Sequence, residues 1–366
     1  MKKRVIVSGG GTGGHIYPAV AVAEELMAQM GDDVEVLFVG ADGRMEMQKI
    51  PALGYNIVGL PIAGLQRRLD WHNIQVPFKL MKSIRRAKRV VKEFNADLVI
   101  GFGGYASAPI LWAAQQEGVP TMIQEQNSYA GLTNKILAKR AKRICVAYDG
   151  MQRFFEKSKI TLTGNPLRGS FTKGEITRKS SLEQFGLSEE LPTVLIVGGS
   201  LGTRTLNEMM KHYIATAKSD KVQVIWQTGK YYEREMQEFA SQHDMKGIWQ
   251  GAFIERMDMA YTAADVVISR SGACSVSELC LLGKATIFVP SPNVAEDHQT
   301  CNAMALVDKD AAMMVRDVDA KEMGMSTALE LIAAKDKVAS LEQNIKALAT
   351  PNAARDIVKI AKEIMK

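Results

Sequence analysis

The chain has 366 residues, of which 46% are hydrophobic and 23% are charged, and its formal net charge is +6. The length favours two domains of about 100–200 residues each, with the composition of an ordinary globular protein. The four cysteines show no CxxC spacing, which argues against a zinc site or a disulfide framework. They are Cys145, Cys274, Cys280 and Cys301.

Two apolar stretches in the first half of the chain predict neither export nor membrane insertion. The apolar run at residues 5–7 stops at Ser8, far short of the roughly 7–15 apolar residues of an export signal. The long uncharged stretch at residues 98–116 is interrupted by glycines and a proline, which is typical of strand, loop and helix rather than of a membrane span. We therefore expect a reduced, cytosolic protein.

Short apolar runs alternate with helical patterns in two series. The first series predicts strands at 4–8, 35–39, 98–101, 121–124 and 144–147, with helices such as 16–30 and 78–94 between them. The second predicts strands at 193–197, 222–227, 265–269 and 285–289. Strands that alternate with helices in this way predict parallel sheets of the α/β class.

A polar stretch at 165–188 separates the two series. We expect two Rossmann-like domains that face each other across a cleft. The first comprises residues 1–164 together with a basic amphipathic helix at about 351–366, and the second comprises residues 165–350.

The first glycine-rich loop, at residues 8–15, follows a predicted strand and opens a helix. Such a loop lets the backbone approach an anion at the helix N-terminus. Gly9, Gly11 and Gly14 satisfy GxGxxG, but the nearest acid for a dinucleotide ribose is Asp42, which comes later than the expected spacing of about 20 residues. A nicotinamide dehydrogenase is therefore disfavoured, and a purely structural role for the glycines stays open.

A basic segment follows at residues 66–92, with nine Lys or Arg and one acid. Helical spacing of about 100° per residue predicts that Leu80, Ile84, Ala87, Val91 and Phe94 are core. We expect an anionic membrane surface to contact a second set of side chains, in which apolar residues lie among cations: Trp71, Ile74, Phe78, Met81, Lys82, Arg85, Arg86 and Arg89. A merely solvated charged face is the alternative, and nucleic acid is disfavoured because no groove-reading motif is present.

Two more loops open helices in the second half. Residues 198–202 fit GxSxG, and a hydrolase would require partners such as Asp265 and His298. That hypothesis leaves the glycine-rich first half unexplained, whereas a serine among glycines also binds phosphate. In the loop at 269–278, Glu278 is expected in the first helical turn, where it balances the helix dipole or accepts hydrogen bonds from ribose hydroxyls.

Seven motifs occur together in order: GGTGGH at 10–15, GFGGY at 101–105, EQN at 125–127, GNPLR at 164–168, GGS at 198–200, SRSGA at 269–273 and EDHQ at 296–299. Over about residues 4–305 the chain resembles the MurG family, which transfers N-acetylglucosamine from UDP to the undecaprenyl-diphosphate-linked muramyl-pentapeptide. The resemblance implies a GT-B fold, an inverting transfer that requires no cofactor or metal, and a peripheral position on the cytoplasmic face of the plasma membrane. It also implies lipid I and other cell-wall synthesis proteins as partners, and no nucleic acid.

The resemblance also implies roles for individual residues. Ser200 and Arg168 would contact the donor diphosphate, and Ala273, Cys274 and Ser275 its α-phosphate. Phe253 would cap the uracil and Ile254 would pair with its edge. Glu278 would hold the ribose, and Gln299 the sugar hydroxyls. Thr12, Gly13, Gly14 and Asn127 would approach the N-acetylglucosamine and the acceptor.

The chemistry requires a base for the acceptor hydroxyl and stabilisation of the departing diphosphate. His15 is the first candidate base, with helix capping or acceptor binding as its alternative role, and Glu125 is the second. The two DxD patterns, Asp308–Asp310 and Asp317–Asp319, are expected to be solvated surface. A UDP-sugar epimerase of similar build and a non-catalytic UDP-sugar-binding subunit remain alternatives.

Overall fold

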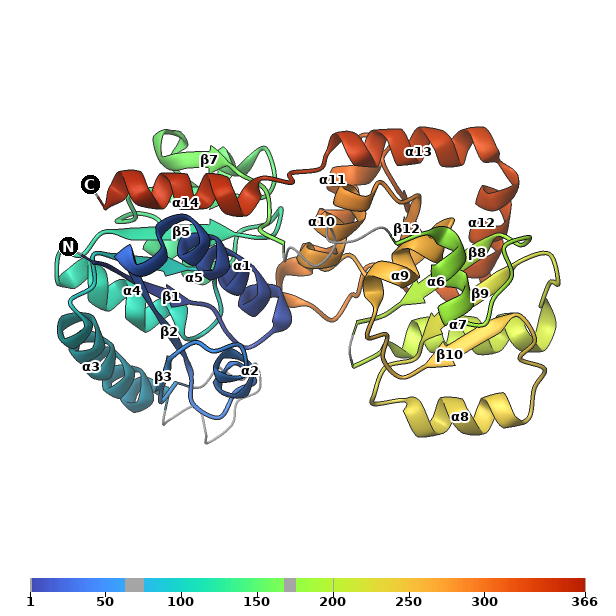
Figure 1. Cartoon of the computed structure of the whole chain (residues 1–366), viewed down its shortest axis with the longest axis horizontal. Helices are drawn as coiled ribbons and strands as arrows, with labels where there is room; N and C mark the ends of the chain where they lie inside the picture. Colours follow the sequence, from blue (N-terminus) through green and yellow to red (C-terminus); the bar gives the residue numbers. More distant parts are fainter. Residues whose placement is uncertain (1, 63–75, 168–175, 200, 366) are drawn as a thin grey trace. The chain divides into compact units, whose positions relative to one another are not determined.

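The computed structural model describes residues 2–62, 76–167, 176–199 and 201–365, without the side chains of residues 76–78 and 295. The chain divides into two compact units (Figure 1). The first unit comprises Met1–Arg168 and Thr350–Lys366, and the second comprises Gly169–Ala349. The boundaries predicted from the sequence fall after residues 164 and 350.

The first unit is built on a seven-stranded parallel sheet in the order β3-β2-β1-β4-β5-β6-β7. Its strands are β1 (Lys3–Ser8), β2 (Val34–Ala41), β3 (Ile57–Leu60), β4 (Leu98–Gly101), β5 (Thr121–Glu125), β6 (Arg143–Val146) and β7 (Ile160–Leu162). Because all strands are parallel, the loops that follow β1, β4 and β5 lie side by side at the carboxyl edge of the sheet.

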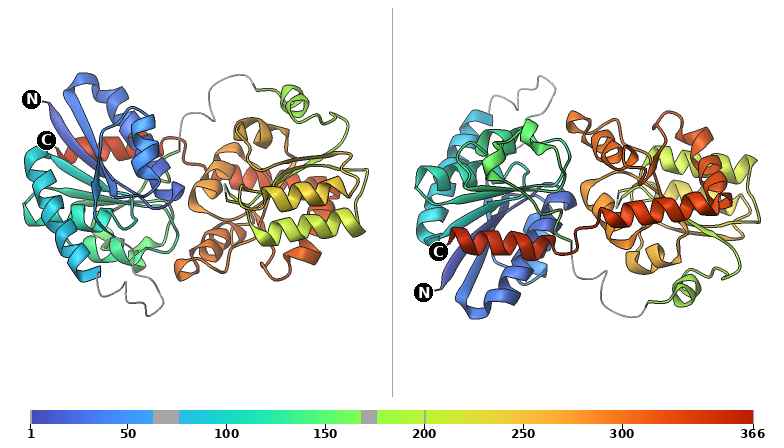
Figure 2. Two further views of the ribbon diagram at one scale, coloured as in Figure 1. Left: turned by 90° about the horizontal axis from the view of Figure 1, so that it is seen from below. Right: turned by 90° about the horizontal axis from the view of Figure 1, so that it is seen from above.

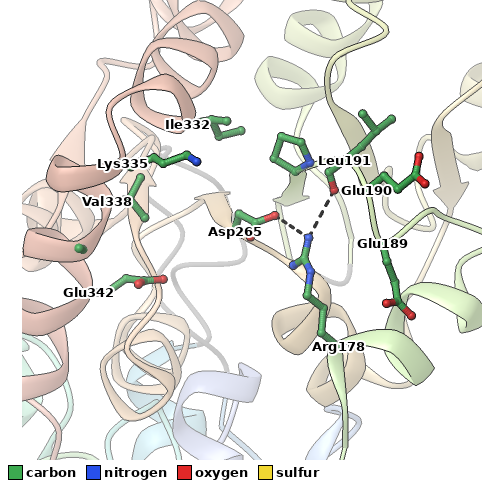
Figure 3. Close-up of a pocket in the computed structure, with 11 residues that line it drawn as sticks. Arg178, Glu189, Glu190, Leu191, Asp265, Ile332, Lys335, Val338 and Glu342 are labelled. Carbon is green, nitrogen blue, oxygen red and sulfur yellow. Dashed lines mark hydrogen bonds and ion pairs between the residues drawn. The ribbon is translucent and has the colours of Figure 1, made fainter.

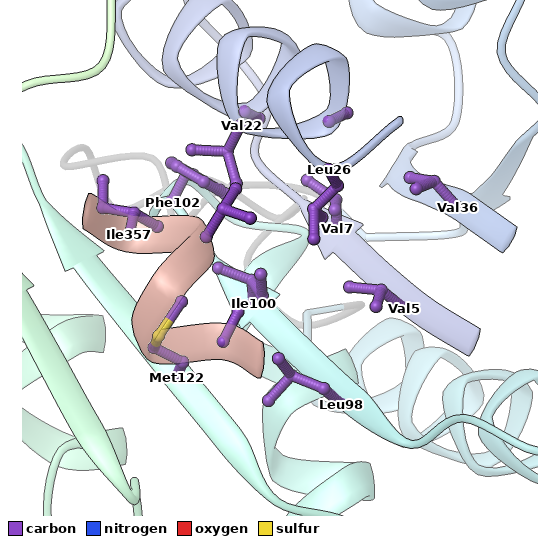
Figure 4. Close-up of a cluster of buried hydrophobic side chains, with 14 of the residues drawn as sticks. Val5, Val7, Val22, Leu26, Val36, Leu98, Ile100, Phe102, Met122 and Ile357 are labelled. Atoms are coloured by element: carbon purple, nitrogen blue, oxygen red, sulfur yellow. The ribbon is translucent and has the colours of Figure 1, made fainter. Parts of the chain in front are cut away.

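Helices cover both faces of this sheet. They are α1 (Gly13–Met30), α2 (Glu46–Ala52), α3 (Val76–Phe94), α4 (Ser107–Gln116), α5 (Leu132–Leu137) and α14 (Ala353–Ile364). One core joins α1 and α14 to the strands through side chains such as Val22, Leu26 and Ile357 (Figure 4). The other core joins α3 and α4 through Ala87, Val91 and similar residues.

The last helix of the chain belongs to this first unit. In α14, Ile357, Val358 and Ala361 are buried, and the helix packs beside α1 (Figure 2). The Lys3 ammonium on β1 also donates to the carbonyl of Met365 at 2.6 Å. The basic amphipathic helix predicted at 351–366 is therefore present and packs on the unit that contains the N-terminus.

The second unit has a six-stranded parallel sheet in the order β10-β9-β8-β11-β12-β13. Its strands are β8 (Thr193–Val197), β9 (Gln223–Gln227), β10 (Ile248–Gly251), β11 (Val266–Ser269), β12 (Thr286–Phe288) and β13 (Met313–Met314). Its helices are α6 (Arg178–Gln184), α7 (Arg204–Thr216), α8 (Glu233–Ser241), α9 (Met257–Ala263), α10 (Ala273–Leu282), α11 (His298–Val307), α12 (Ala320–Ala333) and α13 (Lys335–Ala347). In both units the strand order reverses beside the first strand, and ligands of open α/β sheets bind at such switch points.

Candidate active site

The first glycine loop lies at the switch point of the first sheet. It follows β1, passes through Gly11 at φ +85° and ends at Thr12, the N-cap of α1. Gly13 and Gly14 form the first turn of that helix. A Cβ atom on Gly104, after β4, would lie 2.2 Å from the carbonyl oxygen of Gly10, so the two loops pack backbone against backbone. The helix N-terminus is thereby held at the carboxyl edge, where an anion or a polar ligand group is stabilised.

Glu46 is a buried carboxylate beside this loop, and no local sequence pattern singles it out. One of its oxygens accepts from the backbone N–H of Gly11 at 3.1 Å, and the other accepts from that of Ala41 at 3.0 Å. A Cβ atom on Gly10 would overlap this carboxylate. Glu46 therefore ties the end of β2 to the glycine loop. Asp42, the acid considered for a dinucleotide ribose, instead lies 3.5 Å from Arg86.

The structure brings His15 and the segment after β5 together. His15 Nδ1 lies 3.0 Å from Oε1 of Gln126, a residue that the sequence prediction passed over between Glu125 and Asn127. The His15 ring also packs against Gly103, where an added Cβ atom would lie 3.0 Å from Cε1. Loops after three neighbouring strands thus fix the imidazole.

Glu125, the second candidate base, is 2% exposed. Its two oxygens accept from four donors: the N–H of Asn127 at 3.1 Å, the amide of Asn127 at 3.4 Å, the N–H of Gly131 at 3.1 Å and the amide of Asn134 at 2.8 Å. Four donors occupy the lone pairs of the two oxygens. This arrangement favours a role in shaping the loop that carries Asn127.

Of the residues predicted to contact the donor diphosphate, Arg168 and Ser200 lie outside the described residues. The neighbouring Gly199 carbonyl accepts from the Gln227 amide at 2.9 Å, and Gln227 Oε1 accepts from the N–H of Ile254 at 3.3 Å. Gln227, at the end of β9, therefore links the glycine loop after β8 to the segment that is predicted to contact the uracil ring. Ile254 is buried, whereas Phe253 is 46% exposed.

The loop after β11 leads into α10. Ala273, Cys274 and Ser275 form the first turn of this helix, at the positive end of its dipole. Glu278 lies in the second turn, so its predicted place in the first turn was wrong. The Tyr261 hydroxyl donates to Oε2 of Glu278 at 3.2 Å. Burial and the Glu278 charge raise the pKa of Tyr261 well above its usual range, so the phenol stays protonated and orients the carboxylate.

Gln299 lies in the first turn of α11. Its Oε1 accepts from the N–H of Ser291 at 2.9 Å, and its backbone carbonyl accepts from the Ser271 hydroxyl at 2.8 Å. The side-chain amide is thereby oriented with its NH₂ group left to act as a donor. The preceding residues Glu296 and Asp297 both adopt left-handed backbone conformations, with φ of 55° and 48°, a costly geometry for non-glycine residues that is concentrated at functional loops.

One DxD pattern was misjudged from the sequence. Asp317 is not solvated surface, because its carboxylate lies 2.6 Å from Arg270, whose side chain is 11% exposed. Asp308 and Asp310 are exposed, as expected. Among the described residues, no three His, Cys, Asp or Glu side chains lie together in a way that suits a metal ion.

A hollow of about 420 Å³ lies at the opposite, amino-terminal edge of the second sheet (Figure 3). Its charged lining is partly paired, since Arg178 lies 2.9 Å from Asp265. Burial raises the pKa of Glu342 in this lining. None of the residues predicted to bind the donor lines this hollow; those that are described lie at or beyond the carboxyl ends of the strands.

The basic helix α3 presents most of its cations to solvent. Lys82, Arg85, Arg86 and Arg89 are exposed, and so is Met81, at 49%. Ala87 and Val91 are buried as predicted, but Leu80 is 40% exposed, because the helix turns Ser83 and Ala87 toward the sheet. Trp71 and Ile74 lie outside the described residues, as does the side chain of Phe78. No described helix is long and apolar enough to span a membrane.

Comparisons with known proteins agree with this architecture. Residues 5–146 match the glycosyltransferase family 28 N-terminal domain, and residues 193–362 match the C-terminal domain of that family. A solved structure of MurG from Acinetobacter baumannii is 30% identical, with a TM-score of 0.77 and 99% of each chain covered. A UDP-GlcNAc 2-epimerase from Neisseria meningitidis shares the fold with a TM-score of 0.71, although only 14% of the aligned residues are identical. The alignment covers 98% of this chain and 100% of the epimerase chain. Two Rossmann-like parallel-sheet domains of these types define a glycosyltransferase of the GT-B fold.

Relatives of higher identity narrow the class further. UDP-N-acetylglucosamine--N-acetylmuramyl-(pentapeptide) pyrophosphoryl-undecaprenol N-acetylglucosamine transferase of Parabacteroides distasonis is 51% identical over 357 residues, covering 98% of this chain and 97% of the relative. The transferase of the same name from Bacteroides thetaiotaomicron is 50% identical over 365 residues, covering 99% and 97%. The chain belongs to this MurG family of transferases.

Proposed function

We propose that the protein transfers N-acetylglucosamine from UDP-GlcNAc to the C4 hydroxyl of the muramic acid in lipid I, which yields lipid II for peptidoglycan synthesis. The observation that carries this proposal is identity at about half of all positions, over nearly the whole chain, with relatives named for this transfer. Both halves of a GT-B enzyme are present in this one chain, which argues against a non-catalytic subunit.

The second unit supplies the donor site in this proposal. Phe253 covers the uracil, and the Ile254 carbonyl accepts from its N3–H, since the Ile254 N–H already donates to Gln227. Glu278, oriented by Tyr261, accepts from the ribose hydroxyls. The NH₂ group of Gln299 donates to a sugar hydroxyl.

The first turn of α10 stabilises the diphosphate in the proposed mechanism. Ala273, Cys274 and Ser275 provide backbone dipoles, and Arg168 and Ser200 add the charge and hydroxyl that the family resemblance implies. Negative charge grows on the UDP leaving group in the transition state, and preoriented donors stabilise it there more than in the ground state. We propose that no metal ion is required.

His15 is the base in this proposal. As the acceptor hydroxyl attacks the anomeric carbon, its proton moves to the imidazole, a C–O bond forms and the C–O bond to the diphosphate breaks. One direct displacement inverts the anomeric centre. Glu125 is the weaker candidate because its oxygens already accept four hydrogen bonds. The segments at the carboxyl ends of β1 and β5, which carry His15 and Glu125, also contain the residues that approach the sugar and the acceptor: Thr12, Gly13, Gly14 and Asn127.

A membrane surface is the proposed partner of α3. Exposed Met81 and Leu80 lie among Lys82, Arg85 and Arg89, for which no ion pair with a described residue is present. Apolar side chains ringed by cations suit a leaflet of anionic lipid. We propose peripheral attachment at the cytoplasmic face of the plasma membrane, where lipid I and other cell-wall synthesis proteins are reached.

A transfer assay tests the proposed function. Purified protein is incubated with labelled UDP-GlcNAc and a short-chain lipid I analogue, with and without EDTA, and the product is analysed by mass spectrometry and proton NMR. We expect a β-linked disaccharide product in both conditions. Activity that EDTA abolishes and Mg²⁺ or Mn²⁺ restores would refute the metal-free mechanism. Conversion of UDP-GlcNAc to its 2-epimer without acceptor would favour the epimerase alternative.

A further inference from the structure

Three buried amide side chains form a chain of hydrogen bonds that ends at His15. Gln124 lies on β5, Gln126 directly after it, and Asn165 after β7, and all are at most 1% exposed. The Gln126 amide nitrogen donates to the Gln124 carbonyl at 3.1 Å and also to Gln124 Oε1. The Gln124 amide nitrogen donates to Asn165 Oδ1 at 3.0 Å.

The hydrogen bonds among these three amides are consistent with only one orientation of each amide group. Asn165 Nδ2 donates to the Gln126 backbone carbonyl at 3.0 Å, which leaves its Oδ1 to receive the Gln124 amide. The nitrogen of Gln126 faces two oxygen acceptors, and a flipped amide would place oxygen against oxygen. Amide orientation follows from its partners in this way. Gln126 therefore presents Oε1, an acceptor, to His15.

An acceptor at this place determines where the imidazole carries its proton. Nδ1 of His15 lies 3.0 Å from Oε1 of Gln126, so Nδ1 must be the N–H. In a neutral imidazole the lone pair is then on Nε2, which makes no hydrogen bond with a described residue. Gly103, at φ +91°, lies against the ring and limits its rotation.

We propose that Gln126 is a positioning residue that holds His15 in the Nδ1–H tautomer and so makes Nε2 the proton acceptor. The part of this inference that concerns catalysis rests on the proposed function. In that step the acceptor O–H bond breaks and its proton moves to Nε2, while the oxygen bonds to the anomeric carbon and UDP departs. The resulting imidazolium keeps its Nδ1–H···Oε1 hydrogen bond throughout.

Nitrogen NMR of ¹⁵N-histidine-labelled protein at pH 8.5 tests the tautomer directly. The chain has five histidines, and His15→Asn identifies the His15 signals by their loss. His243, whose Nδ1 lies 2.9 Å from the Phe239 carbonyl, provides an internal example of an Nδ1–H tautomer. We expect the same pattern for His15. An Nε2–H pattern in the unmodified protein would overturn the inference.

A matched pair of variants tests the role of Gln126. Gln126→Met removes the acceptor, and we expect His15 to populate the Nε2–H tautomer and kcat to fall roughly 10- to 100-fold. This loss is no larger than the roughly 100- to 10,000-fold that a general base contributes, because the base itself is still present. KM for UDP-GlcNAc should stay within about twofold, since this residue does not bind the donor. Gln126→Glu keeps an oxygen toward Nδ1 in either protonation state and should retain the Nδ1–H tautomer.

Combining the variants separates positioning from a general structural effect. In the His15→Asn background, Gln126→Met should lower kcat no further, because the two residues act as one unit. Unchanged tautomer and kcat in Gln126→Met would overturn the inference. If Gln126→Met fails to fold, the NMR spectra of the unmodified protein and of Gln126→Glu show whether His15 is held in the Nδ1–H tautomer. If the unmodified protein transfers no sugar, the proposed function is refuted. The tautomer of His15 is still tested by the NMR measurement, which does not depend on activity.

Discussion

The guanidinium of Arg270 lies 2.6 Å from a carboxylate oxygen of Asp317, and the side chains are 11% and 21% exposed. The same guanidinium donates to the Val289 carbonyl at 2.7 Å. Burial lowers the pKa of Arg270, and the hydrogen bond to Asp317 opposes that shift. The pair thus joins the loops after β11, β12 and β13 directly beside the proposed donor site.

Asp317→Ala should lower the free energy of unfolding by about 3 kcal/mol, because it leaves a buried guanidinium without its counter-charge. Urea denaturation measures this. Asp319→Ala is the matched control: its partner Arg316 is 73% exposed, and loss of such a surface pair should cost less than about 1 kcal/mol. Equal effects of the two substitutions would contradict the assigned importance of the buried pair.

Glu46→Ala should also destabilise the protein, by about 2–4 kcal/mol. It removes the acceptor of two backbone N–H groups, those of Gly11 and Ala41, and leaves space beside Gly10. Glu24→Ala, at an exposed position of α1, is the control and should change stability by less than about 0.5 kcal/mol. Hydrogen exchange of the Gly11 amide should rise in Glu46→Ala only. If this amide keeps its protection, Glu46 does not hold the loop.

Tyr261→Phe should weaken UDP binding about five-fold, which is the loss of one hydrogen bond of roughly 1 kcal/mol. The carboxylate of Glu278 then loses the hydroxyl that orients it. Glu278→Ala should weaken binding more, because the ribose hydroxyls lose their acceptor. Calorimetry with UDP and with uracil separates the effects, since neither variant should alter binding of the base alone. UDP affinity that is unchanged in Glu278→Ala would refute the ribose assignment.

The four cysteines should divide into two reactive and two unreactive thiols. Burial raises the pKa of Cys145 and of Cys280 to about 12, and only a thiolate reacts rapidly. Cys274 and Cys301 are half-buried. At pH 8 a disulfide reagent should label these two first and the other two only in urea. UDP should slow labelling of Cys274, in the first turn of α10, more than that of Cys301.

The raised pKa values of Cys145 and Cys280 also predict that the protein is less stable at alkaline pH. A raised pKa in the folded state means that the stabilisation is complete below the unfolded-state pKa, near 9, and is lost as pH rises toward 12. The free energy of unfolding should therefore fall by about 1.4 kcal/mol per pH unit for each buried thiol. Cys145→Ala should remove one such contribution between pH 9.5 and 10.5. An unaltered slope would show that the thiol ionises equally in both states.

Charge reversal on α3 should release the protein from anionic vesicles. Met81→Ser combined with Lys82→Glu, Arg85→Glu and Arg89→Glu should reduce co-sedimentation with phosphatidylglycerol vesicles at least tenfold, since each cation contributes about 1 kcal/mol. Arg86 is left in place because it pairs with Asp42.

Lys321→Glu, Lys335→Glu and Lys337→Glu in the second unit form the control for this experiment, with an equal change in net charge. Transfer to a soluble acceptor should survive in both variants. Vesicle binding that falls equally in both would show that only the overall charge matters, and the membrane surface would then lie elsewhere.

The central strands of both sheets could be predicted from sequence, and four strands were missed: β3, β7, β10 and β13. All four are the edge strands of their sheets. Central parallel strands are buried on both faces and form continuous apolar runs, as in β4 and β8, whose predicted bounds match the structure. An edge strand such as β10 is only partly buried, so it lacks that signal.

Candidate site residues could be selected from the sequence where backbone geometry demands particular residues. Glycine loops and helix starts leave local patterns, and these patterns made His15 and the first turn of α10 candidates. Gln126, Gln227, Glu46 and Tyr261 act through hydrogen bonds between distant segments; His15 and Gln126 are 111 residues apart. Such pairs leave no local pattern in one sequence. For the same reason the partner of Asp317 could not be foreseen.

The return of α14 to the first unit has a consequence for synthesis of the protein. Ile357, Val358, Ala361 and Met365 complete a core whose other buried residues come from the first half of the chain. When a ribosome has made residues 1–168, the apolar side of α1 that α14 will cover is still open to solvent. It stays open while about 180 further residues of the second unit, Gly169–Ala349, are translated, roughly 10–40 s at 5–20 residues per second. The nascent first unit therefore presents an apolar groove to chaperones for that whole interval, and a ribosome that stalls within the second unit leaves it uncovered.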